Sequence, residues 1–248
     1  MKKIIVTLFV LTLSLQAKTI TIAVAANVSY AIEELKTDFS QQYPDIRVRV
    51  ILGSSGKLTA QIKNGAPYGL FMSANMKYPQ ALYKEKLAIT KPLVYAQGAL
   101  AYLSIKKRDF SQGISLLTDQ SIRRIAIANP KTAPYGMAAF EALKNAKLLD
   151  KLNSKFIYGE SISQTVSYAV TAADIGLIAK SSLYSTRMSH FIKGVNWASV
   201  NPTLYTPIKQ GIVLLKESKN SPEYRAFYDF ILSESAKQIF KHYGYIIS

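Results

Sequence analysis

Apolar, strand-like runs alternate with amphipathic helical runs along most of this chain. Residues 19–24 and 46–52 are rich in aliphatic and β-branched residues, and each run precedes a stretch with helical apolar spacing. The same pattern returns at residues 124–145 and 156–171. Strands separated by helices in this way are typical of right-handed βαβ units. We therefore expect an α/β fold built on parallel sheets.

The alternation falls into two blocks, which predicts two βαβ lobes with a ligand cleft between them. The chain is expected to cross between the lobes near residues 95–98 and 205–207. This prediction assigns residues 18–96 and 207–248 to the first lobe and residues 97–206 to the second. Two such crossings form a hinge that allows the cleft to close on a ligand.

The first 17 residues have the features of a secretory signal peptide. Met1-Lys2-Lys3 is basic, an apolar run follows, and the predicted cleavage site lies after Ala17. The apolar run of about 12 residues is shorter than the ~20 that span a bilayer. We therefore expect a periplasmic protein. The chain contains no cysteine, which excludes disulfides, thiolate zinc sites and thiol catalysis.

The formal net charge is +16, and removal of Lys2 and Lys3 leaves +14. The basic residues are scattered, and no run is longer than Lys106-Lys107-Arg108. No basic helix with interleaved aromatic residues is present, so nucleic acid is not a predicted partner. The charge fits either electrostatic capture of a small anion or a general property of the organism's proteins.

Four predicted strand-to-helix junctions contain mainly small or neutral polar residues. They are Ala25-Ala26-Asn27, Gly53-Ser54-Ser55-Gly56, Ala133-Pro134-Tyr135-Gly136 and Gly159-Glu160-Ser161-Ile162. A helix N-terminus has free backbone N–H groups and attracts anions. Ordinary capping also explains Asn27 and Ser161, the latter with Gln164 as a capping box. Both interpretations, caps and anion donors, stay open at this point.

The sequence gives little support for an enzyme active site. His190 and His242 are the only histidines, and no nucleophile elbow, paired carboxylate motif or metal-ligand spacing is present. We therefore expect a binding protein with no cofactor rather than an enzyme. An exported hydrolase is the remaining alternative, and it requires an activated nucleophile that the sequence does not indicate.

The junctions, in this order and at this spacing, resemble those of the periplasmic molybdate-binding proteins of ABC transporters. The resemblance extends over essentially the whole mature chain and includes residues 61–67, 126–130 and 242–245. It implies a type II periplasmic binding protein fold. It also implies that a tetrahedral dianion, molybdate or tungstate, is held by neutral hydrogen-bond donors and delivered to an inner-membrane ABC permease by a monomer.

The resemblance also implies a set of oxyanion-binding residues. Asn27 and Ser55 would donate from side chain and backbone, Tyr135 and Ile162 from backbone N–H groups, with Ala26 and Ser54 beside them. Molybdenum would be present only within the bound oxyanion. Three departures stand out: Ala26 replaces a common serine or threonine, Ala179 replaces a tyrosine of one branch, and residues 69–71 lack an aspartate that relatives often have before this strand. Binding of another oxyanion such as sulfate, or of a small organic acid, stays open.

Overall fold

The computed structural model describes residues 17–247, so all of the predicted signal peptide except Ala17 lies outside the described residues. Within this range the strands form two five-stranded sheets. The first sheet has the order β2-β1-β3-β10-β4. Its strands are β1 (Lys18–Ala25), β2 (Ile46–Gly53), β3 (Leu70–Ser73), β4 (Leu93–Gly98) and β10 (Ile208–Leu214).

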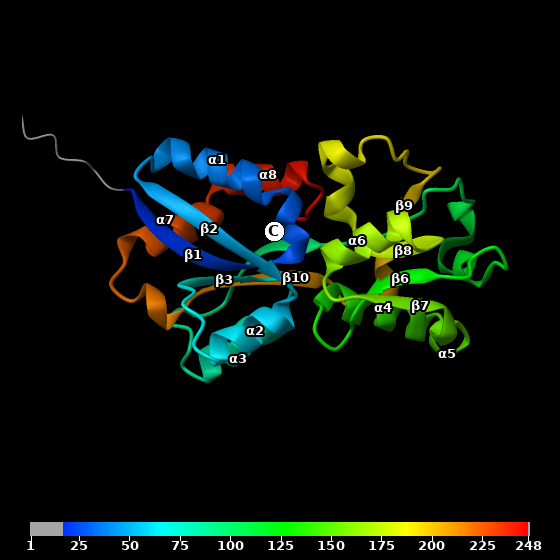
Figure 1. Cartoon of the computed structure of the whole chain (residues 1–248), viewed down its shortest axis with the longest axis horizontal. Helices are drawn as coiled ribbons and strands as arrows, with labels where there is room; N and C mark the ends of the chain where they lie inside the picture. The colour runs from blue at the N-terminus through cyan, green and yellow to red at the C-terminus, as the bar shows by residue number, and fades with distance from the viewer. Residues whose placement is uncertain (1–16, 248) are drawn as a thin grey trace, which may run out of the picture.

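The second sheet has the order β7-β6-β8-β5-β9. Its strands are β5 (Leu100–Leu103), β6 (Ile125–Ala128), β7 (Phe156–Gly159), β8 (Ile175–Ala179) and β9 (Trp197–Ser199). Each sheet is the centre of one lobe, and Figure 1 shows the lobes side by side along the long axis. The exact boundaries given above for the two lobes stay a prediction.

Helices cover both faces of each sheet (Figure 1). The α-helices are α1 (Ile32–Gln42), α2 (Ser55–Lys63), α3 (Lys77–Lys84), α4 (Pro134–Asn145), α5 (Leu149–Leu152), α6 (Ile162–Thr171), α7 (Pro222–Ile231) and α8 (Glu234–His242). The 3-10 helices are η1 (Ala26–Tyr30), η2 (Phe110–Thr118), η3 (Asn153–Lys155), η4 (Lys180–Tyr184), η5 (Thr186–Met188), η6 (Pro202–Leu204) and η7 (Lys216–Ser218).

The alternation of side chains along β1 explains the layering of the first lobe. Ile22 and Val24 pack with α1, α7 and α8 on one face, whereas Ala23 between them packs with α2 and α3 on the other. Successive side chains of a strand point to opposite faces, so a strand covered on both sides is apolar throughout. The second lobe is layered in the same way, with α4 and α6 on opposite faces of its sheet.

Both sheets are mixed, so the expectation of parallel sheets is wrong in part. Strand β1 pairs in parallel with β2 and β3, and β6 pairs in parallel with β7 and β8. Strand β10 is antiparallel to both β3 and β4, and β5 is antiparallel to both β8 and β9. The physical reason is the crossing between lobes, because a chain returning from the other lobe enters the sheet from the cleft end.

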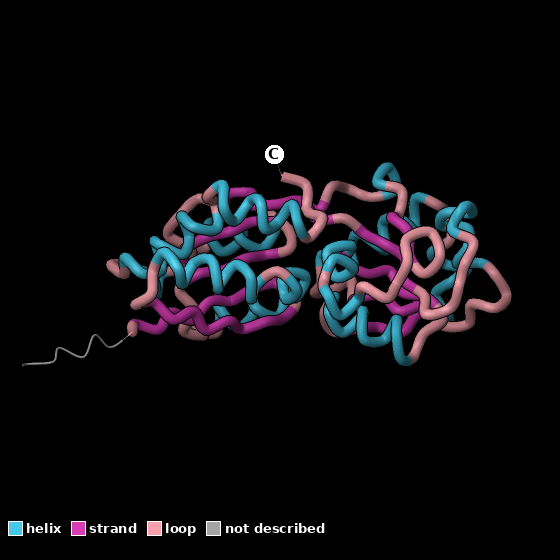
Figure 2. The backbone as a smooth tube through the Cα atoms, turned by 90° about the horizontal axis from the view of Figure 1, so that it is seen from above, coloured by secondary structure: helices cyan, strands magenta, loops and turns pink. Residues whose placement is uncertain are grey.

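The crossings place the ends of the parallel strands beside the second lobe. Strand β4 of the first sheet leads directly into β5 of the second, and the chain returns after β9 into β10. In Figure 2 backbone segments pass from one lobe to the other where the two lobes meet. Among residues 17–247, no helix is long and apolar enough to cross a membrane.

Candidate functional site

A small cavity lies between the two lobes, and all six predicted site residues line it. Measured as the room for the centre of a water-sized sphere, its volume is about 10 Å³. The lining residues come from the ends of β1, β2 and β3 in the first lobe and from the starts of α4 and α6 in the second. They are Ala25, Ala26, Asn27, Gly53, Ser54, Ser55, Ala74, Ala133, Pro134, Tyr135 and Ile162.

The first lobe contributes the N-terminus of α2. Ser55 is fully buried, and its Oγ accepts a hydrogen bond from the Ala74 N–H over 2.9 Å. That contact orients the hydroxyl and leaves its O–H as a donor. Ser54 precedes the helix in an extended conformation, and its buried Oγ has no partner among the described residues. A buried hydroxyl without a protein partner is the kind of group that a ligand satisfies.

Asn27 lies in η1, and the structure differs from the expectation for its side chain. Its Nδ2 donates to Gln210 Oε1 over 2.8 Å and to the Tyr245 hydroxyl over 3.0 Å. The side chain makes no capping hydrogen bond, because the N-cap position belongs to Ala25. Its Oδ1 is buried without a partner in the described chain. The donor that Asn27 retains for an anion is therefore its backbone N–H in the first turn of η1.

The second lobe contributes two helix N-termini. Pro134 begins α4, and Tyr135 follows it, fully buried, in the first turn. The N-cap of α6 is Ser161, whose side chain accepts from the Gln164 N–H, as the capping prediction expected. Within residues 17–247, the N–H groups of Ser55, Tyr135 and Ile162 donate to no other backbone or side-chain group.

The described residues that line the cavity contain no ionisable carboxylate, imidazole, ammonium or guanidinium group. The one titratable side chain among them is Tyr135, and burial raises its pKa well above the usual value. The hydroxyl therefore stays neutral at physiological pH. The field in the cavity comes from the N-termini of α2, α4 and α6, each of which has a partial positive charge. Such a cavity is suited to an anion.

The two lobes touch at the rim of the cavity. The Gly56 N–H donates to the Thr132 carbonyl oxygen over 2.9 Å, and Lys57 forms an ion pair with Glu160. The Ser181 hydroxyl donates to the Asn27 carbonyl oxygen over 3.3 Å. These contacts close the cleft around the cavity.

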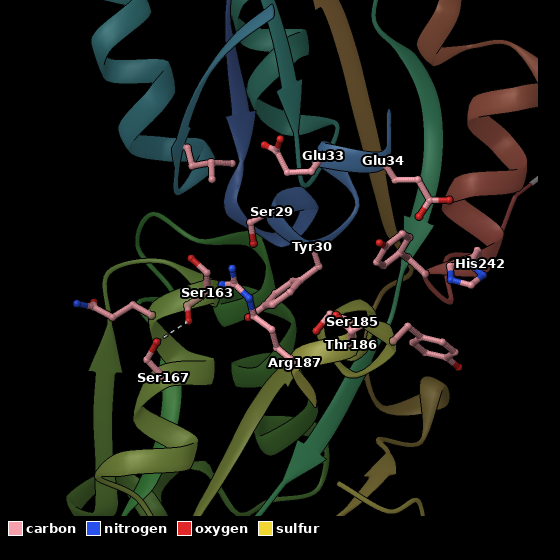
Figure 3. Close-up of a pocket in the computed structure, with 14 residues that line it drawn as sticks. Ser29, Tyr30, Glu33, Glu34, Ser163, Ser167, Ser185, Thr186, Arg187 and His242 are labelled. Carbon is pink, nitrogen blue, oxygen red and sulfur yellow. Dashed lines mark hydrogen bonds between the residues drawn. The ribbon is translucent and has the colours of Figure 1, made fainter. Parts of the chain in front are cut away.

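A larger groove also lies between the lobes, and Figure 3 shows its lining. Its volume is about 760 Å³, and it includes Glu33, Glu34, Arg187 and His242. None of the six predicted site residues lines it. Glu33 and Glu34 line the groove together with Arg187, whereas the small cavity has no charged side chain among its described lining residues and is lined by three helix N-termini, so the cavity is the better candidate for an oxyanion. His242, exposed in the groove, has no nucleophile hydrogen-bonded to it among the described residues.

Two positions noted as departures have different environments. Ala26 lines the cavity, so the missing hydroxyl at this position is missing from the cavity itself. Ala179 ends β8, is buried in the core of the second lobe, and does not line the cavity. Sequence reasoning missed Gln210, Tyr95 and Tyr245, which form the hydrogen-bonded layer beneath Asn27. Gln210 lies within β10, and a lone glutamine beside an apolar run is not a pattern that predicts a site.

Comparison with known proteins shows the family to which this chain belongs. A family model described as bacterial extracellular solute-binding protein matches residues 20–246. The chain belongs to this family. The molybdate-binding protein ModA of Azotobacter vinelandii is 32% identical over 93% of this chain and 90% of its own length. The molybdate-binding protein ModA of Rhodobacter capsulatus is 34% identical over 90% of this chain and 86% of its own.

A solved structure gives the same result for the fold of this family member. The periplasmic molybdate-binding protein of Azotobacter vinelandii superposes with a TM-score of 0.85 at 30% identity. The match covers 92% of this chain and 99% of that one. The predicted periplasmic binding protein fold and the resemblance to molybdate-binding proteins are therefore confirmed. As a member of a solute-binding family, the chain is a transport component that works outside the cytoplasm.

Proposed function

We propose that this protein captures molybdate in the cavity between its lobes and delivers it to an ABC transporter. The observation that supports this most strongly is the uncharged lining, in which the first turns of α2, α4 and α6 meet at one small cavity. The proposal assigns the donor groups to Ser55, Tyr135, Ile162 and Asn27, with Ser54 and Ala26 beside them. Molybdenum takes part only as the oxyanion, and tungstate, which has the same charge and shape, is a second ligand.

The available donors are sufficient for tight binding without a countercharge. Hydrogen bonds to a charged acceptor contribute about 1.5–3 kcal/mol each. About five or six such bonds, less the cost of desolvation and ordering, correspond to roughly −8 to −12 kcal/mol, or micromolar to nanomolar affinity. The partial charges at the three helix N-termini add to this attraction.

The lining also predicts selectivity. Phosphate has a proton near neutral pH and needs an acceptor, whereas molybdate, tungstate and sulfate are unprotonated dianions. No carboxylate lines the cavity among the described residues, and the unpartnered side-chain oxygens are Asn27 Oδ1 and Ser54 Oγ. A neutral oxygen accepts more weakly than a carboxylate, so phosphate is expected to bind much more weakly than molybdate.

The proposal extends to location and partners. A signal peptide cleaved after Ala17 would release the mature chain into the periplasm. There the monomer would meet an inner-membrane permease in its closed, loaded form. No enzymatic step is required, because the anion is held by donors and released when the lobes open. Sulfate or a small organic acid is the alternative ligand.

Calorimetric titration of the mature protein tests this function. Molybdate and tungstate are expected to bind with dissociation constants at or below about 1 μM. Sulfate is expected to be weaker, phosphate weaker still, and citrate without measurable heat. A preference for sulfate or for the organic acid would replace the ligand and keep the binding function. Hydrolysis of generic esters by the same preparation would contradict the non-enzymatic role.

A further inference from the structure

Gln210 is a completely buried polar residue on the strand by which the chain returns to the first lobe. Strand β10 has an irregularity in its pairing with β4 between Gln210 and Gly211. Irregularities of this kind redirect a side chain out of the regular alternation. Here the side chain of Gln210 reaches residues of both lobes.

The amide group of Gln210 joins the two halves of the anion cavity. Its Oε1 accepts from Asn27 Nδ2 over 2.8 Å and from the Tyr95 hydroxyl over 2.7 Å. Its Nε2 donates to the Tyr135 hydroxyl over 3.2 Å. Asn27 belongs to the first lobe and Tyr135 to the second, and both line the cavity. One side chain on the hinge strand therefore holds a residue from each half.

The hinge is shaped to admit this contact. A Cβ atom on Gly98 would lie 2.0 Å from the Tyr135 hydroxyl oxygen and 2.7 Å from Gln210 Nε2. Real Cβ atoms do not approach other atoms so closely, so the absence of a side chain at the end of β4 lets Tyr135 reach Gln210. The side chain of Tyr135 crosses to the hinge, while its backbone N–H remains in the first turn of α4 at the cavity.

We infer that Gln210 is a positioning residue that couples the hinge to the anion cavity through Tyr135 and Asn27. It holds the N-terminus of α4 at the distance from η1 that an oxyanion requires, and it favours the closed arrangement of the lobes. Tyr95 shares the same acceptor oxygen but belongs to the first lobe alone. The inference rests on the proposed oxyanion function, and it adds a determinant of closure that does not touch the anion.

The test compares Tyr135→Phe with Tyr95→Phe as its matched control. Each substitution removes one buried hydroxyl from Gln210, but only the first breaks the link between lobes. Tyr135→Phe is expected to raise the dissociation constant for molybdate about tenfold, the loss of one buried hydrogen bond. Tyr95→Phe is expected to lower the melting temperature and to leave the molybdate affinity within about twofold of the wild type. Gln210→Met is expected to raise the dissociation constant for molybdate at least as much as Tyr135→Phe does.

Small-angle X-ray scattering of the ligand-free variants provides a readout that does not depend on molybdate. Tyr135→Phe is expected to increase the radius of gyration, and Tyr95→Phe to leave it unchanged. Equal effects of the two variants on affinity and scattering, or no effect of Tyr135→Phe on either, would overturn the inference. Wild-type protein that binds no molybdate would instead count against the proposed function, and the scattering comparison would still decide the role of Gln210.

Discussion

The backbone N–H of Gly56 donates to the carbonyl oxygen of Thr132 over 2.9 Å, and this bond joins the two lobes beside the cavity. Gly56 is in the first turn of α2, and Thr132 precedes α4. The contact requires the backbones to approach closely. A Cβ atom on Gly56 would lie 2.9 Å from the Thr132 oxygen and 3.0 Å from its Cα. Closure of the cleft therefore requires glycine at position 56.

Gly56→Ala is expected to act as a wedge between the lobes. Overpacking of this kind costs about 1–3 kcal/mol, which corresponds to a dissociation constant for molybdate that is about 5- to 150-fold higher. Within the first lobe the added Cβ would lie 2.8 Å from the Tyr78 hydroxyl oxygen, the end of a side chain that can shift, so the ligand-free melting temperature should be unchanged or slightly lower. Calorimetry and thermal unfolding measure the two effects. If Gly56→Ala binds molybdate as tightly as the wild type does, the added Cβ does not hold the lobes apart.

Ser55→Ala is expected to weaken molybdate binding by about 10- to 150-fold, because it removes a hydroxyl donor to a charged ligand. In the wild type the Ala74 N–H donates to Ser55 Oγ, and the substitution removes this acceptor. The ligand-free melting temperature should therefore fall. Thr59→Val is the matched control. Thr59 is a buried hydroxyl one turn later in α2 that bonds the Ser55 carbonyl oxygen over 2.7 Å and does not line the cavity.

The control should lower the melting temperature and leave the affinity for molybdate within about twofold of the wild type. An equal loss of affinity in both variants would show that helix α2 as a whole, rather than the Ser55 hydroxyl, determines binding.

Stability should fall on the alkaline side. Burial raises the pKa of Tyr245 to about 12, and burial also raises the pKa of Tyr95 and Tyr135 well above the usual value of 10.0. These phenols keep their protons in the folded chain but lose them above pH 10 when it unfolds. The unfolded state then binds fewer protons, so the free energy of unfolding decreases as pH rises from about 10 to 12.

Melting temperatures between pH 8 and 11.5 measure this effect. Tyr245→Phe should be less stable at pH 8, because it loses the hydroxyl bonds to Asn27, and its melting temperature should fall less steeply with pH. If the melting temperature of Tyr245→Phe falls with pH as steeply as that of the wild type, or more steeply, the alkaline loss of stability does not come from the Tyr245 phenol.

Lys57→Ala should change molybdate affinity only slightly, by less than about fivefold, because exposed ion pairs contribute roughly 0–1 kcal/mol. Lys57 and Glu160 are both more than half exposed, although their pair joins the lobes. Titrations at low and high salt compare the variant with the wild type. A loss of a hundredfold would indicate that Lys57 meets the anion directly, which the uncharged lining of the cavity does not predict.

Local periodicity was sufficient to predict the elements that flank the cavity. The predicted helix at residues 162–171 and the strand at residues 175–179 have the bounds found in the structure. Strands β4, β5 and β9 were not predicted. They are short, and a four-residue apolar run such as β5 has no period that separates a buried strand from a helix. The antiparallel return strands depend on the crossings, which local patterns do not encode.

The six predicted cavity residues could be found from sequence because each lies where a strand-like run is followed by a helix, a relation between neighbours in the chain. The hydrogen-bonded layer of Gln210, Tyr95 and Tyr245 beneath Asn27 could not be found in this way. Gln210 meets Asn27 across 183 positions and Tyr245 meets it across 218, and no local pattern predicts such pairs. The side-chain amide of Asn27 was therefore expected to face the anion, whereas these distant partners bond to its nitrogen.

The position of molybdenum in crystals of the protein grown with molybdate tests the central claim most directly. Anomalous diffraction is expected to show one strong peak in the cavity, with oxyanion oxygens within hydrogen-bond distance of the N–H groups of Ser55, Tyr135 and Ile162. A peak in the larger groove beside Arg187, or a closed cavity without molybdenum at saturating ligand, would contradict the claim that uncharged donors from both lobes hold the anion.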